Sequence, residues 1–226
     1  MTSLTADQMR EADRRCIQDL GLPGVVLMNN AGAAVFEEVR KLAADGPVGV
    51  VCGKGNNGGD GYVVARLALL AGYETRVVTL APPDAVTGDA LVFRTVYERL
   101  GGQITNVFET EDDVTRAVAG LSDCAVLVDA LLGTGIKGEV HGVFRAAIEA
   151  WPAVPTVAVD LPSGLHADTG EPCGCCIAAT TTVTFQFPKR GFDNAAARQY
   201  TGRLVVADIG IPAVCAEDDA WREVQL

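Results

Sequence analysis

The sequence predicts an α/β domain of three layers, in which helices cover both faces of a mostly parallel sheet and two extra helices precede that sheet. Short apolar runs alternate with segments of helical periodicity along most of the chain. A glycine-rich turn follows the first apolar run, and two helical patterns come before it. No repeat, low-complexity stretch or linker divides the 226 residues, so we expect residues 1–226 to form one domain.

The N-terminal segment predicts the two extra helices. Thr5 and Gln8 have the spacing of a capping box, which marks a helix start. The apolar face of this helix, which ends at Gly21, consists of Met9, Ala12, Cys16 and Leu20. Pro23 suits the first turn of the second helix, whose apolar stripe consists of Met28, Ala31, Val35, Val39 and Leu42. We expect the two helices either to cover the sheet or to form a dimer contact.

The alternating part begins with an apolar strand at 48–52. Nine residues that include five glycines follow at 53–61, and a helix is expected over 60–71. The further expected strands are 74–80, 103–108, 125–129, 156–160, 181–187 and 203–207. The further expected helices are 87–100, 112–119 and 143–151. This alternation is typical of βαβ units and therefore of a parallel sheet.

Composition excludes several classes of protein. The net charge of −11 argues against a nucleic-acid surface, which needs a basic patch. No apolar run approaches the about 18 residues of a membrane span, and the N-terminus lacks the pattern of a signal peptide. The seven cysteines are odd in number and scattered, and their one cluster lacks a second pair at zinc spacing. These features predict a cytoplasmic protein that binds neither membrane nor nucleic acid.

The glycine-rich segment resembles a ligand-binding turn between a strand and a helix. A P-loop would end in Gly-Lys-Ser/Thr, which is absent here. Gly53, Gly55 and Gly58 match the dinucleotide fingerprint G-x-G-x-x-G. Its second anchor, an acidic residue at the end of the next strand, is missing because that strand ends at Leu80. An ordinary nicotinamide-dependent oxidoreductase is therefore disfavoured.

Three polar loops each follow an expected strand. The carboxyl ends of parallel strands lie along one edge of the sheet, where such folds bind ligands. Asn57, Asp129, Asp160 and Ser163 should therefore approach a common cleft. Each aspartate alternatively caps the helix that follows it, since Asp is a favoured cap. The presence of two such aspartates, each followed by a glycine-containing turn, favours a site.

Four ordered segments resemble one known family. They are PGVVLMNNAG (23–32), GKGNNGGDG (53–61), VDALLGTG (128–135) and VDLPSG (159–164). From about Met9 to about Ile211 the chain is similar to the YjeF N-terminal domain, the family of the NAD(P)H-hydrate epimerases. The family usually has an acidic residue where this chain has Asn29. The resemblance implies a Rossmann-like fold. Many relatives carry a fused dehydratase domain, and we expect this protein to be a stand-alone form without it.

The resemblance also implies an activity and a site. The implied reaction interconverts the R and S epimers, at C6, of hydrated NADH and NADPH (NADHX and NADPHX). The implied cofactor is one K⁺ per subunit, with Asn57, Asp129 and Ser163 as ligands. These are hard oxygen donors, which suit a hard cation. The implied substrate-binding residues are Asn56, Asn57, Gly58, Gly59, Asp60, Gly133, Thr134, Gly135, Ile136, Lys137, Gly138, Glu139 and Asp160.

Asp160 is the expected catalytic acid/base, because inversion at C6 requires a proton to be given and another to be taken. Lys137 and Lys189 are candidates for a second proton donor or a phosphate contact, or are solvated surface lysines. The runner-up function is a non-catalytic ligand- or partner-binding module of the same fold. We also expect a possible homodimer and functional coupling to a separate NAD(P)HX dehydratase.

Overall fold

The core of the fold is one sheet of seven strands, all parallel, in the order β3-β2-β1-β4-β5-β6-β7. The computed structural model describes residues 3–136, 138–218 and 221. Its strands are β1 (Val48–Cys52), β2 (Thr75–Thr79), β3 (Ile104–Asn106), β4 (Val126–Ala130), β5 (Thr156–Val159), β6 (Thr181–Phe185) and β7 (Arg203–Ala207). The chain runs outward in opposite directions from β1 and β4, so these neighbours form the switch point where such sheets bind ligands.

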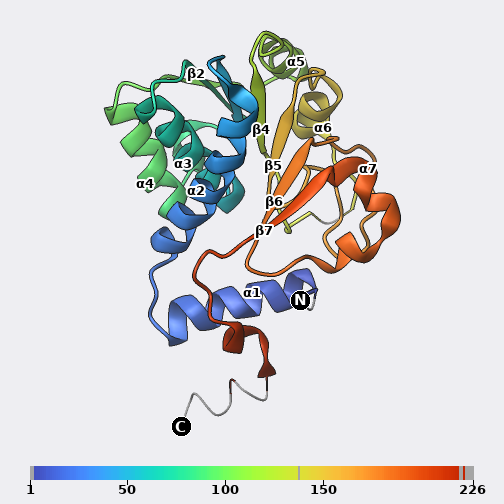
Figure 1. Ribbon diagram of the computed structural model, residues 1–226. Coiled ribbons are helices and arrows are strands. Elements are labelled where there is room, and N and C mark those ends of the chain that lie inside the picture. Colours follow the sequence, from blue (N-terminus) through green and yellow to red (C-terminus); the bar gives the residue numbers. More distant parts are fainter. Residues whose placement is uncertain (1–2, 137, 219–220, 222–226) are drawn as a thin grey trace.

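Helices cover both faces of the sheet, as the alternating pattern predicts (Figure 1). One layer consists of α2 (Gly24–Ala43), α3 (Asn56–Leu70) and α4 (Gly88–Arg99). The opposite layer contains α5 (Glu111–Ala119) and α6 (Gly142–Glu149). Successive residues of a strand point to opposite faces. Val50 accordingly packs in the apolar core beneath α2, α3 and α4, and Val51 packs in the core beneath α5 and α6.

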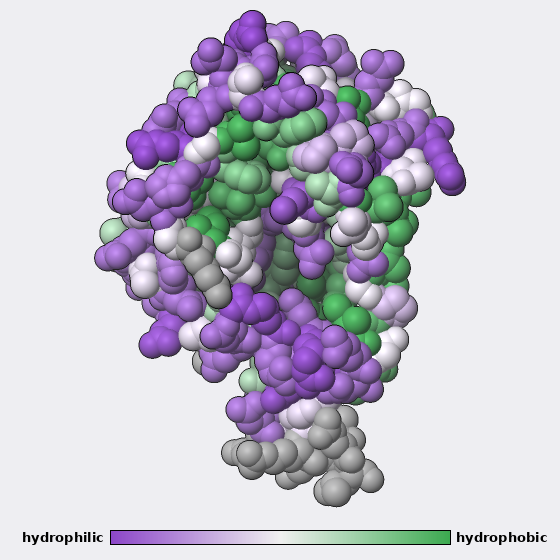
Figure 2. Space-filling model, turned by 180° about the vertical axis from the view of Figure 1, so that it is seen from behind, coloured by the Kyte–Doolittle hydropathy of each residue, from purple (hydrophilic) through white to green (hydrophobic). Residues whose placement is uncertain are grey.

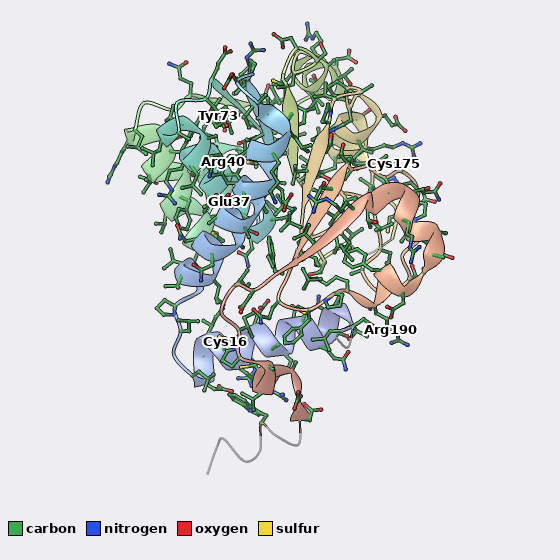
Figure 3. The ribbon with its side chains drawn as sticks, in the orientation of Figure 1. Cys16, Glu37, Arg40, Tyr73, Cys175 and Arg190 are labelled. Carbon is green, nitrogen blue, oxygen red and sulfur yellow. The ribbon has the colours of Figure 1, made fainter. Side chains whose placement is uncertain are left out.

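The first helix, α1 (Ala6–Arg14), begins at the predicted capping box. It continues into a π-helical turn, Arg15–Asp19, and crosses the carboxyl ends of the strands (Figure 1). Cys16 is buried where α1 meets the C-terminal turn Ala213–Ala216 (Figure 3). Leu20, expected on the apolar face, is 42% exposed, because the π turn rotates the following residues relative to a regular helix. The second extra helix, α2, covers the sheet face over β4, β5 and β6.

The glycine-rich segment differs from the expectation. Helix α3 begins at Asn56 rather than Asp60, so the turn is only Gly53–Gly55. None of the five glycines has a positive φ. Four of them, all but Gly55, instead permit close packing: a Cβ on Gly58 would lie 2.0 Å from the Gly53 carbonyl oxygen, and one on Gly61 would lie 2.6 Å from Ala130 Cβ. The glycines therefore place the first turn of α3 directly against β1 and β4.

The remaining expectations agree with the structure to within a few residues. The expected strand at 103–108 shortens to β3, and the strand at 181–187 ends at Phe185. The segment between β6 and β7 contains two short 3₁₀ turns, Arg190–Asp193 and Ala195–Ala197, and the one-turn helix α7 (Arg198–Thr201), none of which periodicity indicates. Across the part of the chain that the structure describes, no helix combines the length and apolar character needed to cross a bilayer.

Candidate functional site

A cavity of about 520 Å³ lies at the carboxyl ends of the strands, beside the switch point. Its walls come from α1, α2, the first turns of α3, the loop after β4 and the ends of β5 and β6. Figure 2 shows the molecule hollowed on one face, with hydrophobic residues inside and hydrophilic residues around them. The apolar part of the lining includes Met9, Leu27, Met28, Leu131, Ile136, Phe144, Phe185 and Ile209. The cavity therefore combines apolar walls with a few polar groups, as small-molecule sites do.

Many of the site residues expected from the sequence line this cavity. They are Asn56, Asn57, Asp60, Gly133, Thr134, Gly135, Ile136 and Asp160. Gly58 and Gly59 are buried behind the wall, because they pack against Gly53 and Met28 respectively. Gly138 and Glu139 are exposed and lie outside the lining, and Lys137 lies outside the described residues.

Asp160 lines the cavity and lies directly after β5. Its φ of +65° is in the left-handed region, which Asp tolerates better than most residues. Its Oδ1 accepts hydrogen bonds from Thr184 Oγ1 (3.0 Å) and from the backbone N–H of Phe185 (3.3 Å). These bonds from β6 hold the carboxylate beside the cavity, and its side chain is 14% exposed.

Lys189 is buried and forms an ion pair with Asp160. Its Nζ lies 2.5 Å from Asp160 Oδ1, and the lysine side chain is 1% exposed. The ammonium also donates to Thr184 Oγ1 at 3.0 Å and to the Phe185 carbonyl at 3.4 Å. The solvated-surface interpretation of Lys189 is therefore wrong. Lys189 lies in the segment after β6 and lines the cavity together with Asp160.

Two further carboxylates belong to this site. Asp60, on α3, is 7% exposed, and burial, with added repulsion from Asp160 and Asp13, raises the pKa of its carboxyl well above the usual range. Asp13, on α1, lines the same cavity. Burial and then repulsion from Asp160 raise the pKa of Asp13 to about 6, against the opposing effect of Lys189. Sequence reasoning missed Asp13, although its spacing from Met9 and Cys16 places a charge on the apolar face of that helix.

The three expected potassium ligands gather around one short segment, residues 131–132. Asp129 Oδ2 accepts from the backbone N–H of Ser163 (2.7 Å), and its Oδ1 accepts from Ser163 Oγ (2.5 Å). Ser163 Oγ accepts in turn from the N–H of Leu132 (2.9 Å), whose carbonyl accepts from Asn57 Nδ2 (3.2 Å). Asp129 and Ser163 are fully buried. Burial raises the pKa of Asp129 to about 6, although the hydrogen bonds from Ser163 oppose that rise.

Fold and site together define a class of protein. A doubly wound parallel sheet with a cavity at its switch point is a Rossmann-like ligand-binding domain. The model of the family described as "YjeF-related protein N-terminus" matches residues 24–191, and the chain belongs to this family. Helix α1, which carries Asp13, lies outside the matched range.

Curated relatives fall into two groups. The NAD(P)H-hydrate epimerase of Limosilactobacillus reuteri is 38% identical, over 93% of this chain and 97% of its own length. The NAD(P)H-hydrate epimerase of Rhodopirellula baltica is 36% identical, over 92% of this chain and 84% of its own length. The bifunctional NAD(P)H-hydrate repair enzyme Nnr of Moorella thermoacetica is 44% identical, but the chain spans only 41% of its length.

A solved structure supports the fold. The crystal structure of the yeast protein ynu0 (YNL200c) superimposes with a TM-score of 0.75 and covers 88% of this chain. Its sequence identity is 22%, so this similarity concerns the architecture alone. The predicted Rossmann-like α/β fold is thereby confirmed.

Proposed function

We propose that this protein is an NAD(P)H-hydrate epimerase, which interconverts the R and S forms of NADHX and NADPHX at C6. The observation that carries the proposal is the buried Asp160–Lys189 pair at the wall of the cavity. The names of relatives similar over most of their own length support the same activity. The runner-up function, a non-catalytic binding module, does not explain why an ion pair is buried at the cavity wall.

The chemistry follows from the substrate. A hydroxyl on C6 beside the ring nitrogen forms a hemiaminal, so the nitrogen lone pair assists breaking of the C–O bond or, after ring opening, of the C–N bond. Either route needs a group that gives or takes a proton at the reacting oxygen or nitrogen. Asp160 is the proposed group. Lys189 holds the Asp160 carboxylate in place, because its ammonium lies 2.5 Å from Asp160 Oδ1.

Binding of the dinucleotide would use both polar backbone segments of the site. The first N–H groups of α3 have no partner within the helix and favour an anion such as a pyrophosphate. The loop 133–136, with two glycines, lines the same cavity, and its backbone N–H groups would contribute to binding of the pyrophosphate. The apolar walls formed by residues such as Met28 and Phe144 would contact the flat rings.

Potassium is the proposed cofactor, and the donor set fits it. Asp129 is a fully buried carboxylate, and no basic side chain among residues 3–136, 138–218 and 221 pairs with it. A buried charge of this kind requires a counter-charge. Asn57, Asp129 and Ser163 would hold the ion, which would supply positive charge beside the substrate when bound. We expect KCl to stabilise the protein against heat more than tetramethylammonium chloride does, and Asp129→Asn to abolish that difference.

Compartment and partners complete the proposal. All seven cysteines are free thiols, which supports a reducing compartment such as the cytoplasm. Functional coupling to an NAD(P)HX dehydratase is proposed on the family resemblance, and the existence of relatives named bifunctional repair enzymes supports it. The homodimer stays a prediction, which the mass of the protein in solution would test.

One experiment tests the proposed activity. A single pure epimer of NADHX is mixed with the wild type in KCl, and the two epimers are separated by chromatography over time. We expect rapid equilibration by the wild type and by Asp112→Asn, an exposed control on α5, and none above the spontaneous rate by Asp160→Asn. A wild type that leaves the epimer unchanged would refute the epimerase and favour the binding module.

A further inference from the structure

Inversion at C6 poses a geometric problem that one carboxylate does not solve. In the route through water loss, the hydroxyl leaves from one face of the ring and water returns to the other. Each face needs its own proton donor or acceptor. Asp160 lies on the wall formed by the sheet edge, and a second group must reach the cavity from another wall.

We propose that Asp13 is the second acid/base group of this reaction and acts on the face of the ring opposite Asp160. The inference rests on the proposed function. Asp13 lies on α1, which crosses the carboxyl ends of the strands (Figure 1). Met9, Arg10 and Asp13 of this helix line the same cavity as Asp160. The partial exposure of Asp13 leaves its carboxyl accessible from the cavity.

The other charged residues of α1 have partners, and Asp13 has none among the residues that the structure describes. Asp7 pairs with Arg10, and Glu11 pairs with both Arg14 and Arg15. These pairs occupy the basic side chains of the helix. The carboxyl of Asp13 is therefore held in the cavity without a hydrogen bond or ion pair that would occupy it.

The placement of α1 is fixed by the segment that carries Lys189. The backbone N–H of Leu4 donates to the Pro188 carbonyl (2.9 Å), and the N–H of Arg190 donates to the Leu4 carbonyl (2.8 Å). The helix start is also bound by Asp168, which accepts from the N–H of Ala6 at 2.7 Å. Arg190 is seen beside α1 in Figure 3. The start of α1 is thus hydrogen-bonded to the residues immediately before and after Lys189. These bonds fix the position of Asp13 relative to Asp160.

The environments of the two carboxylates suit opposite roles. Asp160 has an ammonium 2.5 Å from its Oδ1, and this cation compensates the negative charge that a base carries. Among the described residues no cation pairs with Asp13, and burial, followed by repulsion from Asp160, raises its pKa to about 6, so that it holds a proton more readily. The titratable and charged groups around Asp13 are Asp60, Asp160, Lys189, Cys16 and Arg10. A carboxylate paired with a cation and a partly buried carboxyl without a partner suit the base and the acid of an acid/base pair.

The proposed step balances. The protonated carboxyl of Asp13 gives its proton to the C6 hydroxyl, the C–O bond breaks, and its electron pair leaves with water while the nitrogen lone pair forms a C=N bond. Water on the other face forms the new C–O bond, the C=N pair returns to nitrogen, and Asp160 takes the proton. One water leaves, one enters, and one proton passes from Asp13 to Asp160. The roles are exchanged in the reverse direction.

The test compares Asp13→Asn, Asp13→Glu and the control Asp112→Asn with the wild type. Initial rates are measured from each pure epimer between pH 5 and pH 8.5, and binding of intact NADH is measured separately. We expect Asp13→Asn to lower kcat by about 100-fold or more, with the Kd for NADH within about twofold of the wild type. Asp13→Glu should restore part of the rate, because it keeps a carboxyl at this position.

The pH profile separates a chemical role from a structural one. For the direction in which Asp13 is the acid, wild-type kcat should fall as the pH rises above about 6, and Asp13→Asn should lose this dependence. An unchanged kcat and pH profile for Asp13→Asn beside an active wild type would overturn this inference and leave the epimerase standing. A wild type without activity would refute the proposed function itself. Equal loss of rate and of NADH binding would make Asp13 a binding residue and overturn the inference.

Discussion

We predict that loss of the buried Asp160–Lys189 ion pair lowers the free energy of unfolding by several kcal/mol. Lys189→Met removes an ammonium that is 1% exposed, lies 2.5 Å from Asp160 and donates to Thr184. The carboxylate is then left close to Asp13 and Asp60 without a cation. Breaking a buried pair in this way costs about 3–5 kcal/mol. Because Asp160 borders the cavity and is 14% exposed, water compensates part of the loss, and we expect a cost near the lower end, about 3 kcal/mol.

The double variant gives the magnitude of the coupling. Asp160→Asn alone leaves the ammonium buried without its counter-charge, at a cost of about 2–3 kcal/mol. The backbone should tolerate this change, because Asn adopts the left-handed region readily. Lys189→Met combined with Asp160→Asn leaves neither charge unpaired. We therefore expect the double variant to be destabilised by at least about 2 kcal/mol less than the two single variants together.

The assay is urea unfolding followed by circular dichroism, at pH 8 and at pH 5. The cost of Lys189→Met should be smaller at pH 5, since protonation of the carboxylates removes the repulsion among them. Lys41→Met is the matched control: that lysine is 61% exposed in its pair with Glu38, so its loss should cost at most about 1 kcal/mol. Additive costs in the double variant, to within about 0.5 kcal/mol, would refute the reasoning.

Three other substitutions test separate features of the structure. Asp13→Asn should stabilise the protein by up to about 3 kcal/mol at pH 8 and not at pH 4, because the folded state raises the pKa of Asp13 from 3.8 to about 6 and disfavours the ionised form. Asn29→Asp should add about 0.5–1.5 kcal/mol, because Arg66 Nη2 already donates to Asn29 and the buried Arg66 Nε has no partner among the described residues. Gly58→Ala should cost about 3 kcal/mol, since its Cβ would lie 2.0 Å from the Gly53 carbonyl oxygen. Urea unfolding measures all three.

Each of these predictions has a control. Asp112→Asn, at an exposed position, should not reproduce the pH-dependent gain of Asp13→Asn. Replacing Arg66 by Met should abolish the gain from Asn29→Asp, and a gain that survives would contradict the proposed pair. Gly55→Ala should cost at most about 1 kcal/mol, because nothing lies within 4 Å of its Cβ position and only its place as the N-cap of α3 disfavours Ala. Equal costs at Gly55 and Gly58 would contradict the packing explanation.

The sequence alone predicted the fold class and the approach of many candidate site residues to one cavity. Alternation of apolar runs and helical segments is a local signal, and it indicated the parallel sheet correctly. Because parallel strands end at one edge, position along the chain was enough to bring Asn57, Asp129 and Ser163 together. The four motifs identified the family that the comparison with its model confirms.

Only the tertiary structure decided which charged side chains are buried in the site and which glycines serve close packing. Whether a lysine is solvated depends on what packs over it, so Lys189, 29 positions after Asp160, could not be placed from its neighbours in sequence. Asp13 enters the site because residues near Leu4 pair with the loop around Pro188, a contact that spans most of the chain. Gly58 serves close packing rather than a flexible turn, since its neighbour is the Gly53 carbonyl. Periodicity reports which residues are apolar, whereas burial of a polar group depends on contacts between distant segments, and those form only when the chain folds.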